Sequence, residues 1–190
     1  MGSEEGINLN YYENGKLESI IEIKNDKKNG FSSFYHDNGN IKSVCNCKKD
    51  DMYGRCYFYR EDGKLHLINF FDYLGETFYV IEINEKGDTI YNEGVVFSPN
   101  FEFNIPKESI KANEKIKINI AVAELDNKKT FIKVGVGENL KDVPIKDCIA
   151  TYETSFNQKG EYKINVLGEI YDENNKLYKS RNEVIIIVVK

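Results

Sequence analysis

A glycine recurs every 24 residues through the first half of this chain. Gly15, Gly39, Gly63 and Gly87 are evenly spaced (39 − 15 = 24), and a second series at positions 6, 30 and 54 keeps the same step. Two glycine series with one period and no insertion between them are typical of a repeat protein, in which each unit is a small supersecondary structure. The repeat therefore restricts residues 6–94 to a stack of similar units.

Each unit alternates apolar and polar residues and then turns. One face of the first predicted strand carries Leu17, Ser19, Ile21 and Ile23. Residues 25–30 (Asn-Asp-Lys-Lys-Asn-Gly) are the predicted turn, because Asn, Asp and Gly tolerate positive φ. A second short strand is predicted at 31–35, before an Asn-Gly turn at 38–39. Each unit is thus a predicted β-hairpin, and the hairpins are expected to pair into one elongated antiparallel sheet.

Three segments of the repeat share one pattern, in which a tyrosine precedes an Asn-Gly or Asp-Gly turn and then Leu or Ile: 11–17, 35–41 and 59–65. The pattern G-x-x-x-x-Y-x-x-[ND]-G-x-[LI] resembles the bacterial variant of the MORN repeat over residues 6–94. Bacterial proteins built from this variant are often labelled antitoxin components of toxin–antitoxin pairs, which the resemblance extends to this chain as an expectation. The fourth unit departs from the pattern at Phe78 and Ile83. We interpret it as a terminal unit that closes the sheet or leads into the next domain.

The second half, residues 95–190, predicts further strands without a helical period. Pro99 and Pro106 are expected to confine the segment 95–104 to a sheet edge or a switch between sheets. In the two clearest strands the side chains predicted to face the core are Ile116, Ile118, Ile120 and Val122, and then Val184, Ile186 and Val188. Several short strands of this spacing favour a β-sandwich.

The segment around Gly160 and Tyr162 resembles the tyrosine corner of immunoglobulin-like domains, in which a tyrosine hydroxyl bonds back to the chain just upstream. The predicted fold is therefore all-β. It combines an elongated antiparallel sheet of stacked 24-residue hairpins at 6–94 with a C-terminal Ig-like β-sandwich at 95–190.

The charge of the chain limits its partners. The formal net charge is −5 and the sequence pI is about 5.3, whereas a duplex nucleic-acid binder needs a basic surface. No run of residues reaches the roughly 18 apolar positions of a membrane span, so no direct membrane insertion is expected. The Met1-Gly2-Ser3 start is compatible with an expression remnant. The location is thus left open: cytoplasm as the chain stands, or periplasm or cell surface where a native signal peptide has been removed.

The four cysteines are Cys45, Cys47, Cys56 and Cys148. Cys45 and Cys47 occupy the repeat positions of Ile21 and Ile23, so we expect them to replace core side chains as buried free thiols. A zinc site completed by His36 or His66, or a disulfide, is the alternative that the spacing leaves open. We expect no metal.

Neither histidine is expected to lie beside the nucleophile or carboxylate that catalysis would require. His36 shares its repeat position with Tyr12 and Arg60, and His66 follows Leu65 at a position expected to face solvent. The carboxylates gather in turns and on polar strand faces, and no nucleophile elbow or phosphate-binding loop is present. We therefore predict no enzyme activity, no catalytic residue and no cofactor.

Tyrosines provide the candidate binding residues. Tyr11, Tyr35 and Tyr59 recur at one repeat position, and Tyr57 is expected on the same face as Tyr59, with Phe58 opposite. Stacked hairpins would place them along the sheet, where they serve cross-strand packing or recognition of another protein.

Two functions follow from these features. The first is a non-enzymatic protein-interaction module, such as an antitoxin or immunity-type protein that occludes its partner, with the acidic surface suited to a basic effector. The alternative is a structural or surface protein of the cell envelope, lipoprotein-like, by analogy of fold alone.

Overall fold

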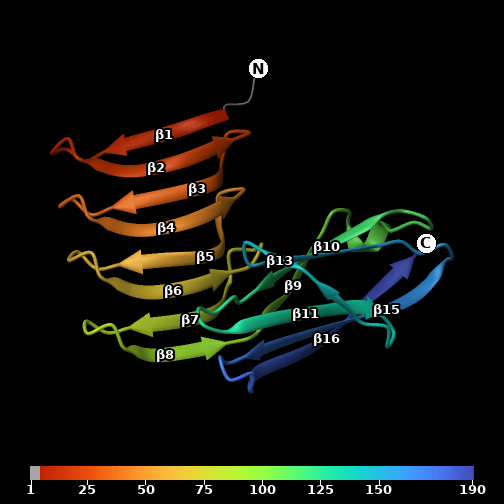
Figure 1. Ribbon diagram of the computed structural model, residues 1–190. Coiled ribbons are helices and arrows are strands. Elements are labelled where there is room, and N and C mark those ends of the chain that lie inside the picture. Colours follow the sequence, from red (N-terminus) through yellow and green to blue (C-terminus); the bar gives the residue numbers. More distant parts are fainter. Residues whose placement is uncertain (1–4) are drawn as a thin grey trace. The chain divides into compact units, whose positions relative to one another are not determined.

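The computed structural model describes residues 5–190 and is all-β (Figure 1), as predicted. The described residues form strands β1 to β16 and one short 3₁₀ turn, η1 (Lys107–Ser109), and contain no α-helix. The start at Met1-Gly2-Ser3, interpreted above as compatible with an expression remnant, lies outside this range. The chain divides into two compact units, of which the first ends at Gly94 and the second is Val95–Lys190.

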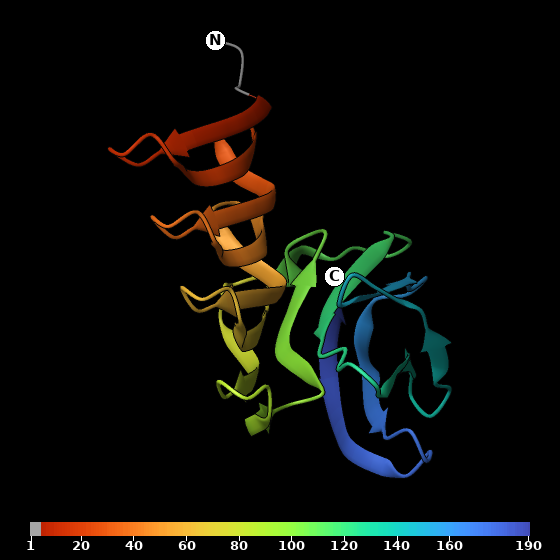
Figure 2. The ribbon, with the colours of Figure 1, turned by 60° about the vertical axis from the view of Figure 1, so that its left-hand side comes forward.

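The first unit is a single antiparallel sheet in which the strands follow chain order, which confirms the predicted stack of hairpins. Its strands are β1 (Glu5–Tyr11), β2 (Leu17–Lys24), β3 (Lys27–Tyr35), β4 (Ile41–Lys48), β5 (Asp51–Tyr59), β6 (Leu65–Phe71), β7 (Thr77–Ile83) and β8 (Thr89–Gly94). Figure 2 shows that the strands of this unit curl strongly. Two kinds of turn and two kinds of irregularity produce this shape, and all of them follow the sequence repeat.

The turns at the two ends of the hairpins differ. At one end Gly15 and its repeat equivalents close the turn at positive φ, and the Gly15 N–H donates to the Tyr12 carbonyl at 2.9 Å. At the other end the turn that joins β2 to β3 consists of two residues, Asn25 and Asp26, at φ 54° and 61°. Asn and Asp tolerate this left-handed conformation better than other non-glycine residues. The predicted turn at 25–30 was therefore too long.

Gly30 belongs to strand β3 rather than to a turn. The pairing of β2 with β3 shifts between Ile21 and Ile23, and Gly30 adopts φ 116° beside this shift. A Cβ at Gly30 would overlap the Glu22 carboxylate, whose Oε2 accepts a hydrogen bond from the Phe31 N–H at 3.1 Å. Gly30 thus marks an irregularity inside β3, at a backbone conformation that favours glycine.

A β-bulge also recurs near the start of each even-numbered strand. Tyr11 pairs with Leu17 and Asn10 pairs with Ser19, so Glu18 has no partner across the strand. The unpaired residues of the four hairpins lie at the same repeat position: Glu18, Lys42, His66 and Ile90. A bulged residue makes no ladder contact, which explains why this position accepts four different residue types.

The curl of the strands brings the side chains of one face of the sheet together, and these side chains form its core. Its core includes Ser19, Ile21, Ser32, Ser43, Cys45, Cys56 and Phe71, all less than a tenth exposed. Five of these seven side chains are serine or cysteine, which are small enough for the curled strands to approach one another closely.

The prediction of a free thiol is wrong for Cys45, which forms a disulfide with Cys56 between β4 and β5. Cys47 is a buried free thiol as expected, and Cys148 is a second one. The register that pairs Ser43 with Phe58 and Val44 with Tyr57 also places Cys45 opposite Cys56, with their Cα atoms 4.4 Å apart, and the pairing shifts only beyond them. The sequence alone does not show which residues of neighbouring strands lie opposite each other, so the disulfide was one alternative among three.

The second unit consists of two four-stranded antiparallel sheets. The first has the order β13 (Ile145–Lys146), β14 (Ile149–Thr154), β10 (Ile116–Val122) and β9 (Phe97–Phe103); the second has the order β12 (Lys141–Val143), β11 (Lys129–Val136), β15 (Gly160–Tyr171) and β16 (Leu177–Val189). Strand β9, which contains Pro99, lies at an edge as predicted. A Cβ at Gly168 of β15 would strike Val96 and Phe97, so the two sheets pack face to face.

The predicted inward face of β10 is correct, but that of β16 is wrong. Val184, Ile186 and Val188 are 50%, 44% and 49% exposed, whereas Ile185, Ile187 and Val189 are buried. Residues 184–189 are all apolar, so their alternation carries no information about the face. The partner strand decides it, because buried Ile164 of β15 pairs with Ile185.

Tyr162 lies near the start of β15. Its hydroxyl donates to the carbonyl of Gln158, four residues upstream, at 3.0 Å. The Tyr162 ring stacks on Phe156 at 3.9 Å between centroids. This hydrogen bond is the one that the resemblance to a tyrosine corner predicts.

Candidate protein-interaction face

The four predicted binding tyrosines lie on one side of the eight-stranded sheet, which we call the tyrosine face. The pairing register runs from Leu9 through Ile20, Ser33 and Val44 to Tyr57. Tyr11, Tyr35 and Tyr59 lie two residues beyond Leu9, Ser33 and Tyr57 on the same strands, so alternation places them on this side. Phe58 pairs with Ser43 and lies on the opposite side, as predicted.

The exposure of the tyrosine face decreases along the sheet. Tyr11 is 57% exposed and Ile7, on the same strand, is 67% exposed, whereas Tyr35, Tyr57 and Tyr59 are half-buried. The rings of Tyr11, Tyr35 and Tyr59 make no contact with one another within the described residues. Because they lie on alternate strands, they are about 9–10 Å apart, twice the spacing of neighbouring strands. The face is therefore an apolar surface with separated hydroxyl groups rather than a stack of rings.

Tyr57 is held in place by its neighbours. Arg55 donates from Nη1 to the Tyr57 hydroxyl at 3.0 Å, and its guanidinium carbon lies 5.2 Å from the Phe70 ring centroid. The pKa of Tyr59 is raised, chiefly by burial and further by the proximity of Tyr57. Both causes favour the neutral phenol of Tyr59, which can therefore donate a hydrogen bond at neutral pH.

A row of side chains fastens each repeat to the next, and the sequence did not predict it. Tyr12 donates to the Tyr35 carbonyl at 2.6 Å, Nε2 of His36 lies 3.0 Å from the Tyr59 carbonyl, and Arg60 donates to the Ile83 carbonyl at 2.7 Å. Since a carbonyl accepts, His36 carries its proton on Nε2. These three donors, which we call the staple residues, share one repeat position and reach the equivalent carbonyl of the following unit.

The two histidines thus have structural partners. His36 is a staple residue, and His66, predicted to face solvent, is instead half-buried, with Nδ1 2.7 Å from Nη2 of Arg60. Arg60 also donates to the Ile83 carbonyl from the same nitrogen. His36 therefore joins one hairpin to the next, whereas His66 contacts Arg60 of its own hairpin.

The turns near the tyrosine face carry fixed carboxylates. The Lys64 N–H donates to Oδ1 of Asp62 at 3.0 Å, and this bond is the largest cause of the lowered pKa of Asp62, assisted by the Lys64 ammonium. The equivalent Asn38 accepts from the Asn40 N–H at 2.8 Å and donates to the Glu61 carbonyl at 2.8 Å. The turn residues are therefore ordered by bonds within and between hairpins.

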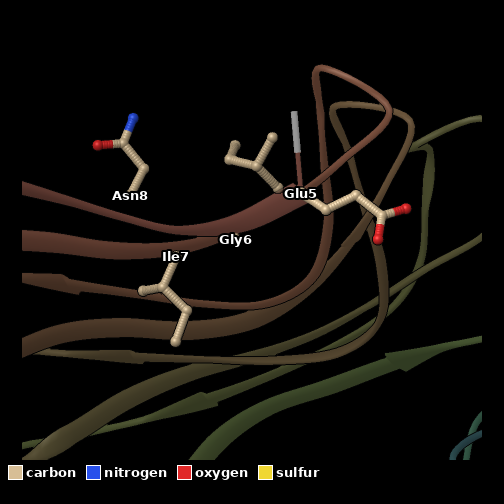
Figure 3. Close-up of a pocket in the computed structure, with 5 residues that line it drawn as sticks. Glu5, Gly6, Ile7 and Asn8 are labelled. Carbon is tan, nitrogen blue, oxygen red and sulfur yellow. The ribbon is translucent and has the colours of Figure 1, made fainter. Parts of the chain in front are cut away.

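The surface of the first sheet carries a hollow at one end. It is lined by Glu5, Gly6, Ile7, Asn8 and Ile23 (Figure 3). Over residues 5–190, no group of three or more His, Cys, Asp or Glu side chains is placed to hold a metal ion. In the same part of the chain, no helix combines the length and the apolar composition needed to cross a bilayer.

Comparison with known proteins agrees with the repeat. Residues 4–25 match the family model described as MORN repeat variant. This segment contains β1, its turn and β2, which together make one hairpin of the first unit. No curated protein matches the chain.

Proposed function

We propose that this chain is a non-enzymatic protein-interaction module that binds another protein through its tyrosine face. The observation that carries the proposal is the surface itself: Ile7, Leu9 and Tyr11 are each about half exposed or more on a sheet whose hairpins are fastened to one another. Tyrosine contributes a large contact area at low entropic cost and is enriched at interfaces. A rigid surface of this kind needs little reorganisation upon binding.

The partner that suits this module best is a basic protein whose working surface becomes occluded. The net charge of −5 favours electrostatic steering of a positively charged partner. MORN repeats generally serve in protein or membrane interaction, and the match at residues 4–25 supports this class of function. An antitoxin or immunity-type role, without catalytic groups or a cofactor, is the specific form that we propose. The module is not expected to bind nucleic acid or to insert into a membrane.

The second unit is proposed to be an Ig-like sandwich that adds a contact or serves as a spacer. Its two four-stranded sheets and the Tyr162 hydrogen bond support this assignment. The architecture does not itself identify an activity.

Affinity capture from the source cells tests the proposal. Purified chain, the double variant Tyr11→Ser/Tyr35→Ser and the control Phe131→Ser/Tyr178→Ser are used as baits, since the control removes two exposed aromatics of the second unit. We expect one protein to be retained in stoichiometric amount by the wild type and the control and lost by the tyrosine-face variant. Equal retention by all three baits, or no retained protein, would contradict the proposal.

A role in the cell envelope is the second candidate, and the Cys45–Cys56 disulfide favours it. Disulfides persist mainly in oxidising compartments such as the periplasm or the cell surface. Denaturation in the presence of a thiol-alkylating reagent, applied directly to the source cells, distinguishes the candidates. Two labelled cysteines per chain support an oxidising location, whereas four labelled cysteines support a reducing one.

A further inference from the structure

The first sheet ends in an open edge at β1 (Figure 1). The repeat equivalents of β1 are β3 and β5, and each of these pairs with a strand on both sides. Among residues 5–190, β1 pairs with β2 alone. The outward N–H and C=O groups of β1 therefore form the same edge that is already filled in β3 and β5. Such an edge is a template for another strand.

The sequence of β1 does little to block this edge. Glu5–Tyr11 contains no proline and no lysine, and Glu5 is its one charged residue. Ile7, Leu9 and Tyr11 are exposed on the tyrosine face, and Figure 3 shows Ile7 and Asn8 on opposite sides of the strand. Natural edge strands usually carry charges, proline or bulges that prevent pairing, and an apolar edge with a single charge at its end favours association.

We propose that two copies of this chain pair through β1, antiparallel, about a two-fold axis that passes midway between their Asn8 residues. The seven residues of Glu5–Tyr11 are centred on Asn8. In this register Ile7 lies opposite Leu9 of the second copy, Asn8 lies opposite Asn8, and Glu5 lies opposite Tyr11. Apolar side chains thus meet apolar ones, the two amides can bond, and no like charges face each other.

The register follows from the symmetry. A two-fold axis perpendicular to the sheet keeps both tyrosine faces on the same side, and this requires one residue of β1 to lie opposite the same residue of the second copy. An axis at Gly6 or Asn10 would pair only three residues within the strand, since either lies next to one of its ends. The axis at Asn8 pairs all seven. The result is one continuous sheet with the tyrosine faces of two copies joined, and it does not depend on which partner that face binds.

Site-specific cross-linking tests the register. In Asn8→Cys the two new cysteines lie directly opposite each other, with Cα atoms about 4.5–5.5 Å apart, which is within the range of a disulfide. In the control Asn10→Cys the two cysteines are offset by four residues, about 13 Å along the strand, and are too far apart. Under mild oxidation we expect covalent dimer to form at least about ten times faster in Asn8→Cys. Equal rates, or faster dimer formation in Asn10→Cys, would overturn the proposal.

Sedimentation equilibrium tests the association itself. We expect the intact chain to dimerise with concentration, and Ile7→Lys/Leu9→Lys to raise the dissociation constant at least tenfold. Val184→Lys/Ile186→Lys adds the same charge to exposed positions of β16 and should leave the dimer intact. A chain that stays monomeric at every concentration, or a dimer lost in the β16 variant and kept in the β1 variant, would overturn the proposal. Circular dichroism of each variant verifies that the sheet content is retained.

Discussion

The staple residues give the most direct prediction about stability. Tyr12→Phe removes the hydroxyl that donates to the Tyr35 carbonyl at 2.6 Å and leaves the ring in place. A hydrogen bond of this kind contributes about 0.5–1.5 kcal/mol net to folding. The bond joins the first hairpin to the second, so its loss weakens the contact between repeats. We expect the free energy of unfolding to fall by about 1 kcal/mol, roughly a fivefold change in the folding equilibrium.

Urea unfolding followed by far-ultraviolet circular dichroism measures this change, because the chain contains no tryptophan. With a slope of about 1–3 kcal/mol per M for small proteins, the midpoint should fall by about 0.3–1 M. Tyr11→Phe is the matched control: Tyr11 is the neighbouring residue, it is 57% exposed, and its hydroxyl has no partner among the described residues. Its midpoint should stay within experimental error of the wild type. Equal midpoints for Tyr12→Phe and Tyr11→Phe would refute the reasoning.

Three further predictions follow from the fold. Gly30→Ala should lower the melting temperature more than Gly39→Ala, because both glycines have positive φ but only at Gly30 would a Cβ overlap a side chain; equal losses would contradict the bend in β3. Ile185→Ala should cost about 2–5 kcal/mol of unfolding free energy and Ile186→Ala less than about 1 kcal/mol, because only the first is buried; the reverse order would restore the face predicted from the sequence. Tyr59→Phe should reduce the loss of stability in alkali, measured as urea midpoints from pH 8 to 11. Because the pKa of Tyr59 is raised in the folded state, its contribution to stability is complete below the unfolded pKa of about 10 and is lost as the pH rises through the folded pKa. An unchanged pH profile would contradict the burial of its hydroxyl.

The parts of the fold that the sequence predicted are those set by local chemistry. The turn glycines at Gly15 and its equivalents adopt positive φ, and their even spacing predicted the successive hairpins that the sheet contains. The buried face of β10 followed from the alternation of Ile116, Ile118 and Ile120 with the polar residues Lys117 and Asn119.

The parts that could not be predicted depend on register between strands. The run of apolar residues at 184–189 has no polar member to mark its outer face. The Cys45–Cys56 disulfide depends on which residues of β4 and β5 lie directly opposite each other. The staple residues Tyr12, His36 and Arg60 share only the ability to donate to a carbonyl, so their common role is invisible in residue identity. The signal that would have found them is a repeat position at which every unit carries a long side chain able to donate a hydrogen bond, whatever its residue type.

The proposed recognition surface is tested most directly by hydroxyl-radical footprinting of the chain with and without its captured protein. Tyr11 and Tyr178 are both about half exposed, at 57% and 40%, and belong to different units. The account predicts that the partner slows the oxidation of Tyr11 at least severalfold and leaves that of Tyr178 unchanged. Oxidation of Tyr11 at the same rate in the free and bound chain would contradict it.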